Sequence, residues 1–111
     1  MMFYKKNGDG YSMPIEGVKL KTLVYGEKTS LCEFRLKQGK AIPSHRHPHE
    51  QTGYLVSGQI KLTIGVETFD VAPGDSWCIP GDVEHTAKCL RDSVVVEVFS
   101  PVREDYLPQG R

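Results

Sequence analysis

Apolar and polar residues alternate along short segments separated by glycines, a pattern typical of strands rather than helices. The glycines at positions 39, 58, 65, 74 and 81 divide runs that are rich in Val, Ile, Thr, Phe and Tyr. No window carries a sustained apolar stripe at helical spacing, so we expect little or no helix. Strands are predicted over residues 18–25, 30–37, 51–57, 59–64, 66–71, 76–80, 84–90 and 93–100.

Pro-Gly pairs mark two turns, in "APGDS" (72–76) and "IPGDV" (79–83). Proline fixes φ at the first central position of a type II turn and glycine takes positive φ at the second, so we predict this turn at both places. The stretch "VSGQI" (56–60) is predicted to be a tight reversal between two strands. Many short strands with frequent turns indicate an all-β sandwich or closed barrel, and periodicity alone leaves the topology open.

Size and charge narrow the function classes. The 111 residues suit one domain, and the formal net charge is +0 with no long basic run. This balance argues against a nucleic acid or an anionic membrane as a partner. The first residues lack the apolar segment of a signal peptide, and no apolar run reaches membrane-spanning length, so we expect a cytoplasmic protein.

The three cysteines, Cys32, Cys78 and Cys89, are scattered along the chain without a CxxC pair. Reduced thiols are therefore expected rather than a disulfide framework or a zinc knuckle. Cys78 and Cys89 are most simply small buried apolar residues.

The stretch "PSHRHPHEQ" (43–51) holds three of the four histidines. If it is extended, His45 and His47 project to one side and Gln51 has the same parity, although the intervening "PHE" is not expected to be regular strand. His85, far along the chain, is a further imidazole. Nitrogen ligands with one carbonyl oxygen suit a first-row divalent ion such as Mn, Fe, Co, Ni or Zn. The alternative is that the histidines are solvated loop residues, which is how we interpret His49 and Glu50.

The segment "SVVVEVFS" (93–100) places a carboxylate in an apolar strand. Val95, Glu97 and Phe99 share one face of it. A buried unpaired carboxylate is costly, so Glu97 either faces solvent, pairs with an arginine such as Arg35, or faces a pocket as a general acid or base. Arg103 either clamps a substrate carboxylate or is a solvated charge of the tail.

Three residues of the neighbouring strands have two interpretations each. Tyr54 is a candidate substrate contact, and strand packing is its alternative. Trp77 is expected to pack between strands rather than to stack on substrate. Gly53, on the parity of Gln51, either makes room near the metal or marks a bulge.

Two segments resemble the paired motifs of the cupin superfamily. "GKAIPSHRHPHEQTGYLVSG" (Gly39–Gly58) resembles the first motif, with Gln51 where glutamate is usual, and "GDSWCIPGDVEH" (Gly74–His85) resembles the second, with Asp82 in place of a glycine. The resemblance implies a double-sheet jelly roll with a metal ion inside, bound by His45, His47, Gln51 and His85. Small cupins of this kind are often homodimers that exchange N-terminal strands, which makes "MMFYKK" a candidate for such a strand.

The tail "EVFSPVREDYL" (Glu97–Leu107) resembles that of the pectin-degradation cupins, which open the ring of unsaturated uronates. That family also has His, His, Gln and His at its metal. The resemblance implies that Glu97 is the catalytic carboxylate, although aspartate is more common there, and that Phe99 and Arg103 contact the substrate. The same tail occurs in small cupins of unknown role.

We therefore predict one cupin domain over residues 1–111, with a core of about residues 16–100. It is expected to be a homodimer that uses Mn, Fe, Ni or Zn to act on a small sugar acid or a related hydroxy or keto carboxylate. Ring opening or isomerisation of unsaturated uronates is the specific version. The first alternative is an Fe- or Mn-dependent dioxygenase or an oxalate-decarboxylase-like enzyme, and the second is a non-catalytic, metal-assisted sugar- or ligand-binding barrel.

Overall fold

The computed structural model describes residues 2–107 and is an all-β fold, as predicted. Its strands are β1 (Ser12–Ile15), β2 (Val18–Tyr25), β3 (Ser30–Leu36), β4 (Ala41–His45), β5 (Glu50–Ile64), β6 (Glu67–Val71), β7 (Ser76–Ile79) and β8 (His85–Ser100). Within the described residues, the helical content is one 3-10 turn, η1 (Glu104–Tyr106). None of the described helical structure has the length and apolar character needed to cross a membrane.

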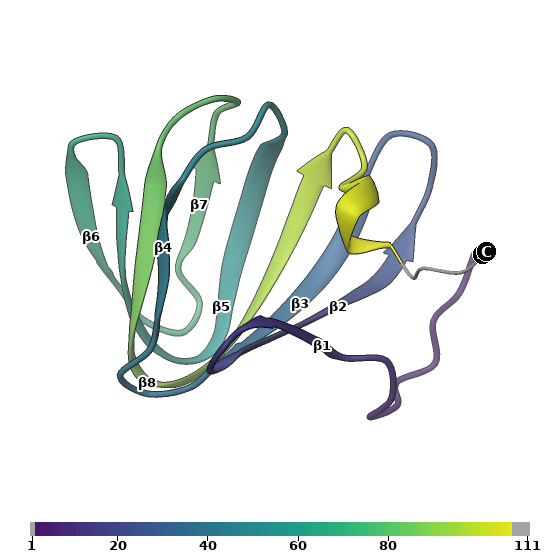
Figure 1. Cartoon of the computed structure of the whole chain (residues 1–111), viewed down its shortest axis with the longest axis horizontal. Helices are drawn as coiled ribbons and strands as arrows, with labels where there is room; N and C mark the ends of the chain where they lie inside the picture. Colours follow the sequence, from purple (N-terminus) through teal and green to yellow (C-terminus); the bar gives the residue numbers. More distant parts are fainter. Residues whose placement is uncertain (1, 108–111) are drawn as a thin grey trace.

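Two long antiparallel strands, β5 and β8, connect the two sides of the molecule (Figure 1). The sheet runs in the order β1-β2-β3-β8-β5-β6, with β4 paired to β8 and β7 paired to β5. β8 therefore pairs with β3 along one half and with β4 along the other, while β5 pairs with β7 and then with β6. This arrangement encloses an interior between the two halves of the sheet.

The predicted reversal at residues 56–60 is wrong, because β5 continues through Gly58 with an irregular register. Gly58 has φ 98°, and a Cβ there would lie 2.1 Å from Oγ of Ser93. Glycine is thus required for the close approach of β8 at a bulge rather than for a turn. The predicted strands 84–90 and 93–100 likewise form one strand, β8, and β1 and β4 were not among the expected strands.

One of the two predicted Pro-Gly turns is confirmed. Gly74 has φ 94°, and the Asp75 amide donates to the Ala72 carbonyl at 3.0 Å. In the second turn the positive φ, 63°, belongs to Asp82 rather than to Gly81. Gly81 instead makes room for the loop before β5, since a Cβ there would lie 2.5 Å from the Pro48 carbonyl oxygen.

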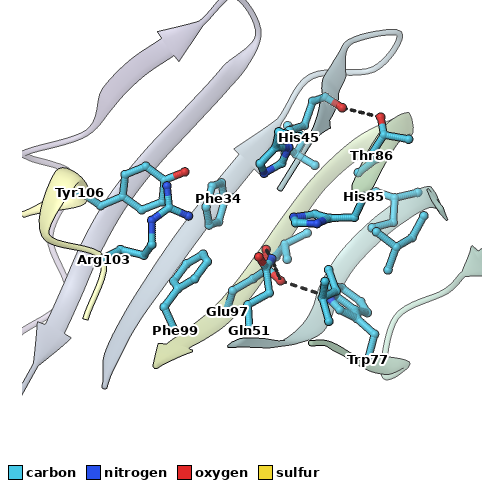
Figure 2. Close-up of a pocket in the computed structure, with 17 residues that line it drawn as sticks. Phe34, His45, Gln51, Trp77, His85, Thr86, Glu97, Phe99, Arg103 and Tyr106 are labelled. Carbon is cyan, nitrogen blue, oxygen red and sulfur yellow. Dashed lines mark hydrogen bonds between the residues drawn. The ribbon is translucent and has the colours of Figure 1, made fainter. Parts of the chain in front are cut away.

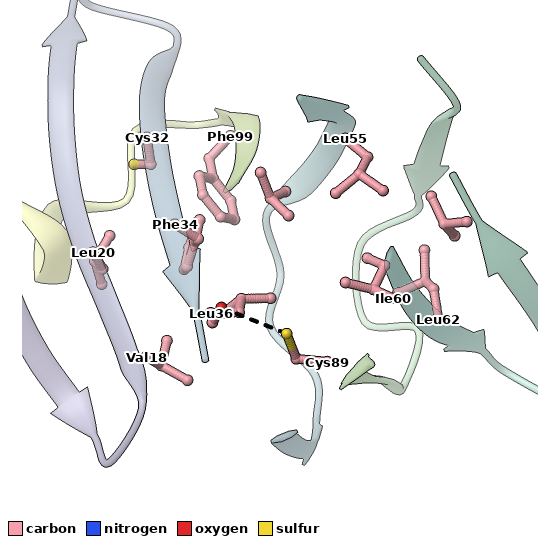
Figure 3. Packing of buried hydrophobic residues seen from close by; sticks show 12 residues of the cluster. Val18, Leu20, Cys32, Phe34, Leu36, Leu55, Ile60, Leu62, Cys89 and Phe99 are labelled. Carbon is pink, nitrogen blue, oxygen red and sulfur yellow. Dashed lines mark hydrogen bonds between the residues drawn. The ribbon is translucent and has the colours of Figure 1, made fainter. Parts of the chain in front are cut away.

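The core fills the space between the two halves of the sheet (Figure 3). Burial alternates along β3 and β8, so that every second side chain points inward. Cys32 and Cys89 are buried within it, but Cys78 is exposed, which corrects the expectation of a buried residue. The buried cluster comprises Val18, Leu20, Cys32, Phe34, Leu36, Leu55, Ile60, Leu62, Val71, Cys89, Val95 and Phe99.

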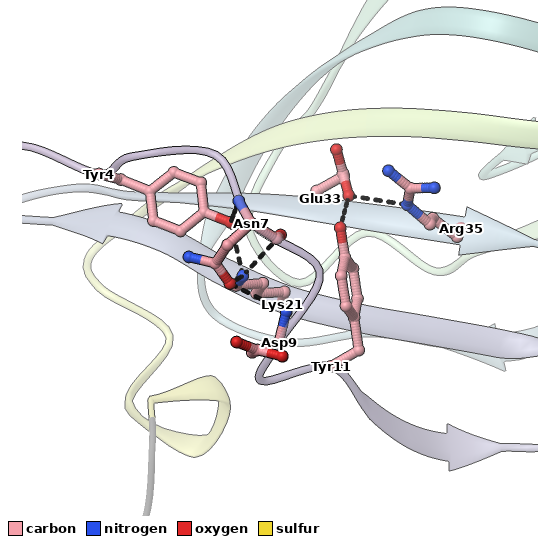
Figure 4. Close-up of polar contacts among 7 residues, drawn as sticks. All are labelled: Tyr4, Asn7, Asp9, Tyr11, Lys21, Glu33 and Arg35. Atoms are coloured by element: carbon pink, nitrogen blue, oxygen red, sulfur yellow. Dashed lines mark hydrogen bonds and ion pairs between the residues drawn. The ribbon is translucent and has the colours of Figure 1, made fainter.

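The N-terminal segment does not form a strand in the single chain over residues 2–6, and Met1 lies outside the described residues. Polar contacts hold the segment against β2 and β3 (Figure 4). Lys21 donates to Oδ1 of Asn7 at 2.9 Å, and the hydroxyl of Tyr11 donates to Glu33. Exchange of an N-terminal strand between two copies stays a prediction.

Candidate metal centre

Three histidines from separate parts of the chain converge at one end of the interior. His45 ends β4, His85 begins β8 as its register partner, and His47 lies in the loop after β4. Their candidate ligand atoms all lie within 4.8 Å of one another. The predicted convergence is confirmed, but strand parity does not explain it, because His47 lies beyond the strand. The Asp82 amide instead donates to the His47 carbonyl at 2.7 Å and fixes this loop.

All three imidazoles share one hydrogen-bonding pattern, with Nδ1 beside a backbone carbonyl oxygen. The Nδ1 atoms of His45, His47 and His85 lie 2.9, 3.1 and 2.8 Å from the carbonyl oxygens of Pro43, His49 and Val83. A proton on Nδ1 satisfies each carbonyl and leaves the Nε2 lone pair available, which is the usual arrangement of metal-binding histidines. In agreement, Nε2 of His47 and of His85 is buried without a hydrogen-bond partner.

Gln51 presents a carbonyl oxygen to the same interior from β5. Its Nε2 donates to both carboxylate oxygens of Glu97, at 2.7 and 2.7 Å, and its Oε1 is buried without a partner. Since a buried acceptor without a partner is unfavourable, Oε1 is a natural ligand for a cation. The nitrogen and oxygen ligand atoms of His45, His47, His85 and Gln51 therefore suit a first-row divalent metal ion.

Burial keeps two of the imidazoles, those of His47 and His85, in the form that binds metal. Burial is the main reason that the pKa of His47 is lowered to about 4, and the charges of Arg103 and the neighbouring histidines lower it further. Burial likewise lowers the pKa of His85. Both rings are therefore neutral at neutral pH, so a metal ion need not displace a proton from them.

Glu97 faces the interior from β8 and is 8% exposed. Besides the Gln51 amide, Nε1 of Trp77 donates to Oε1 of Glu97 at 3.0 Å (Figure 2). Burial outweighs these two donors and raises the pKa of Glu97 to about 7. Arg35 pairs with Glu33 at 3.0 Å instead, which excludes the alternative in which Arg35 neutralises Glu97.

Arg103 lies just after β8 and lines the same cavity, so it is not a solvated tail charge. Its Nε and Nη2 donate to the two carboxylate oxygens of Asp105 at 2.9 and 2.7 Å. Its guanidinium lies over the rings of Tyr106 and Phe99, with 4.0 and 5.0 Å to the ring centroids. The pair and the two rings fix the plane of the guanidinium at the wall of the cavity.

The remaining candidates are placed differently. Phe99 is buried, lines the cavity and meets the His47 ring edge-on at 5.9 Å between centroids. Tyr54 is 48% exposed on the outer face of β5 and is not among the residues that line the cavity, a position that does not favour the predicted substrate contact. It has the parity opposite to that of Gln51, a signal that the sequence already carried.

Trp77 was expected only to pack, and its hydrogen bond to Glu97 was missed. The cavity is otherwise mainly apolar, and its lining residues are Phe34, Leu36, Ile42, His45, Gln51, Ile60, Leu62, Trp77, Ile79, His85, Thr86, Ala87, Val95, Glu97, Phe99, Arg103 and Tyr106.

Comparison with known proteins was consistent with this geometry. A family model described as "Cupin domain" matches residues 32–100. The pectin degradation protein KdgF of Dickeya dadantii is 26% identical over 94 residues, which cover 83% of this chain and 86% of that protein. The structure of KdgF from Halomonas sp. superposes with a TM-score of 0.89 at 27% identity, covering 95% of this chain and 99% of the other. An RmlC-like cupin from Shewanella frigidimarina gives a TM-score of 0.91 at 24% identity, covering 96% of each chain, which shows the fold alone.

Proposed function

The chain belongs to the cupin domain family, and we propose that it is a metal-dependent enzyme of pectin breakdown that opens the ring of unsaturated uronates. One observation carries the proposal. Gln51 and His85 have buried acceptor atoms without partners and share a cavity with the buried carboxylate of Glu97, and His47, with a third such atom, clusters with His85. The likeness to two proteins named KdgF supports a role in pectin degradation.

His45, His47, Gln51 and His85 would hold a divalent metal ion, which would supply a Lewis acid for a hydroxyl or carbonyl oxygen of the substrate. Gln51 is neutral where a glutamate would carry charge, so this ligand set leaves the full positive charge of the ion in place. The apolar lining of the cavity excludes water, so that the electrostatic interaction of this charge with the substrate is stronger than it would be in water.

Glu97 moves the proton in this proposal. Opening a cyclic hemiacetal removes the proton of the anomeric hydroxyl as the ring C–O bond breaks. It leaves an enolate at the former double bond, and a proton returned to carbon gives the ketone. Reactant and product have the same atoms, so one carboxylate that takes and returns a proton is sufficient. The pKa of about 7 suits both directions near neutral pH.

Arg103 binds the carboxylate of the uronate, and Phe99 forms the wall beside it. The pair with Asp105 occupies Nε and one edge of the fork. Because a guanidinium has five N–H donors, donors remain for an anionic substrate group. A cation and an apolar ring near one another distinguish the charged end of a uronate from its hydroxylated face.

The test follows the loss of the ultraviolet absorbance of unsaturated galacturonate with protein reconstituted with Mn, Fe, Ni or Zn. We expect turnover by the wild type and a rate about 100- to 10,000-fold lower for Glu97→Ala. Glu67→Gln, an exposed carboxylate change on β6, is the matched control and leaves the rate unchanged.

Absence of turnover by the wild type with every metal would refute the reaction. Oxygen consumption with diphenols, diketones or oxalate would then favour the redox alternative. Tight binding of sugar acids without turnover would favour a binding protein.

A further inference from the structure

A row of three residues crosses three strands beside the metal centre. In the sheet register Gly53 of β5 is the partner both of Glu97 on β8 and of Trp77 on β7. Neighbouring strands lie about 4.8 Å apart, so the backbones of Trp77 and Glu97 are roughly 10 Å apart. The indole spans this distance across the middle strand, and its Nε1 donates to Oε1 of Glu97 at 3.0 Å.

Gly53 is what allows the indole to cross. A Cβ at this position would lie 2.3 Å from Cε2 and 2.3 Å from Nε1 of Trp77. Such contacts are far below van der Waals distance, so any side chain at Gly53 displaces the ring from Glu97. The hydrogen bond between Trp77 and Glu97 therefore depends on the absence of a side chain at Gly53.

The next contact in this chain determines which atom of Gln51 faces the histidines. An amide can rotate by 180° and exchange Oε1 and Nε2. In the rotated form Oε1 would face the Glu97 carboxylate, which when ionised can only accept, and the NH₂ group would point at the cation site. With Nε2 donating to both oxygens of Glu97, Oε1 is directed to the other side, where it has no partner.

We propose that Trp77 is a positioning residue for the metal centre. Its indole N–H holds the Glu97 carboxylate in place, and Glu97 in turn orients the Gln51 amide with Oε1 toward the metal. Gly53 makes this chain of hydrogen bonds sterically possible. The inference rests on the metal site of the proposed function and is independent of the reaction proposed there.

The direct test is metal affinity measured by calorimetric titration, with the metal alone as the ligand. Trp77→Phe keeps an aromatic ring over Gly53 and removes the N–H donor. We expect metal binding to weaken about tenfold, the lower end of the range for residues that orient metal ligands. Tyr25→Phe removes the polar group of an aromatic residue outside the cavity and should leave the affinity within about twofold.

A double-mutant cycle separates positioning from general damage to the barrel. In a Gln51→Ala background no amide remains to be oriented, so adding Trp77→Phe should change the affinity by less than about twofold. If the loss is equally large in both backgrounds, or if folded Trp77→Phe binds metal like the wild type, the inference is wrong. If the wild type binds no metal at all, the inference and the metal site of the proposed function both fail.

A spectroscopic readout requires no change at Trp77 itself. The chain has one tryptophan, so its indole N–H gives a single, assigned resonance in a nitrogen-edited NMR spectrum. We expect this resonance to shift on metal addition to the wild type and to respond much less in Gln51→Ala. An unchanged resonance on saturation of the wild type would overturn the coupling. If Trp77→Phe fails to fold, Gly53→Ala replaces it in the titration and should show the same loss of affinity.

Discussion

The buried carboxylate of Glu97 should make the stability of the metal-free protein depend on pH in a way that one substitution removes. Its pKa is about 7 in the folded chain against a reference value of 4.5, mainly because of burial. A raised pKa means that the stabilisation is fully present below the reference value and is lost as the pH rises through about 7. Glu97→Gln cannot ionise and should lack this loss.

The magnitude follows from linkage. Between pH 5 and pH 8 the free energy of unfolding of the wild type should fall by about 2 to 3 kcal/mol relative to that of Glu97→Gln. The difference between the two proteins is the useful quantity, because both carry the same histidines. His47 and His85 have lowered pKa values and cause a separate loss of stability as the pH falls below about 6.5.

Urea unfolding of both proteins in the presence of a chelator, at intervals from pH 5 to pH 8, measures this difference. Circular dichroism reports unfolding without relying on the tryptophan, whose environment the substitution changes. A difference in unfolding free energy that stays constant across the range would show that Glu97 is ionised throughout. The explanation of its pKa by burial would then be wrong.

Three further predictions concern metal, thiols and assembly. A metal ion at 100 times its dissociation constant should add about 2.7 kcal/mol to the unfolding free energy, and His85→Ala should lose most of this gain in a thermal shift measurement. Cys78 should react with a thiol reagent in the native protein, whereas Cys32 and Cys89 should react only on unfolding, because Cys78 alone among them is exposed. The predicted homodimer should have twice the mass of the chain by light scattering, and a monomer at all concentrations would contradict it.

Local patterns in the sequence predicted most of the strands, but not β1, β4 or the continuity of β5 and β8. The alternation along β8 correctly predicted that Val95, Glu97 and Phe99 share one face, and the structure shows that this face points inward. Gly58 was misinterpreted as a turn residue, since a glycine in "VSGQI" has the same local signature in a reversal and in a bulge. The contact that distinguishes them, with Ser93 on another strand, depends on the sheet register rather than on neighbouring residues.

In the candidate site, too, some features could be predicted from short stretches of sequence and others depend on contacts between distant strands. The His45, His47 and His85 cluster was predictable because the spacing of two motifs brings known ligand types together. The turn before His85 was less predictable, because the positive φ lies at Asp82 and not at the glycine. The contact between Trp77 and Glu97 requires the register of three strands at once, and no short window of sequence contains that information.

The polar groups of the cavity are the clearest sign that this end of the barrel serves a function rather than stability. Each buried acceptor without a partner costs about 1 to 3 kcal/mol. Nε2 of His47 and of His85 belong to one histidine cluster, and Gln51, whose Oε1 also lacks a partner, lines the same cavity as His85. Apolar side chains of similar size would give a more stable barrel. The protein keeps these groups, and a hydrogen bond at the opposite atom of each side chain orients it. This is the arrangement of ligand atoms in a cation site. Metal binding should therefore stabilise the folded protein, because the ion would give the buried acceptor atoms of this site the partners that they otherwise lack.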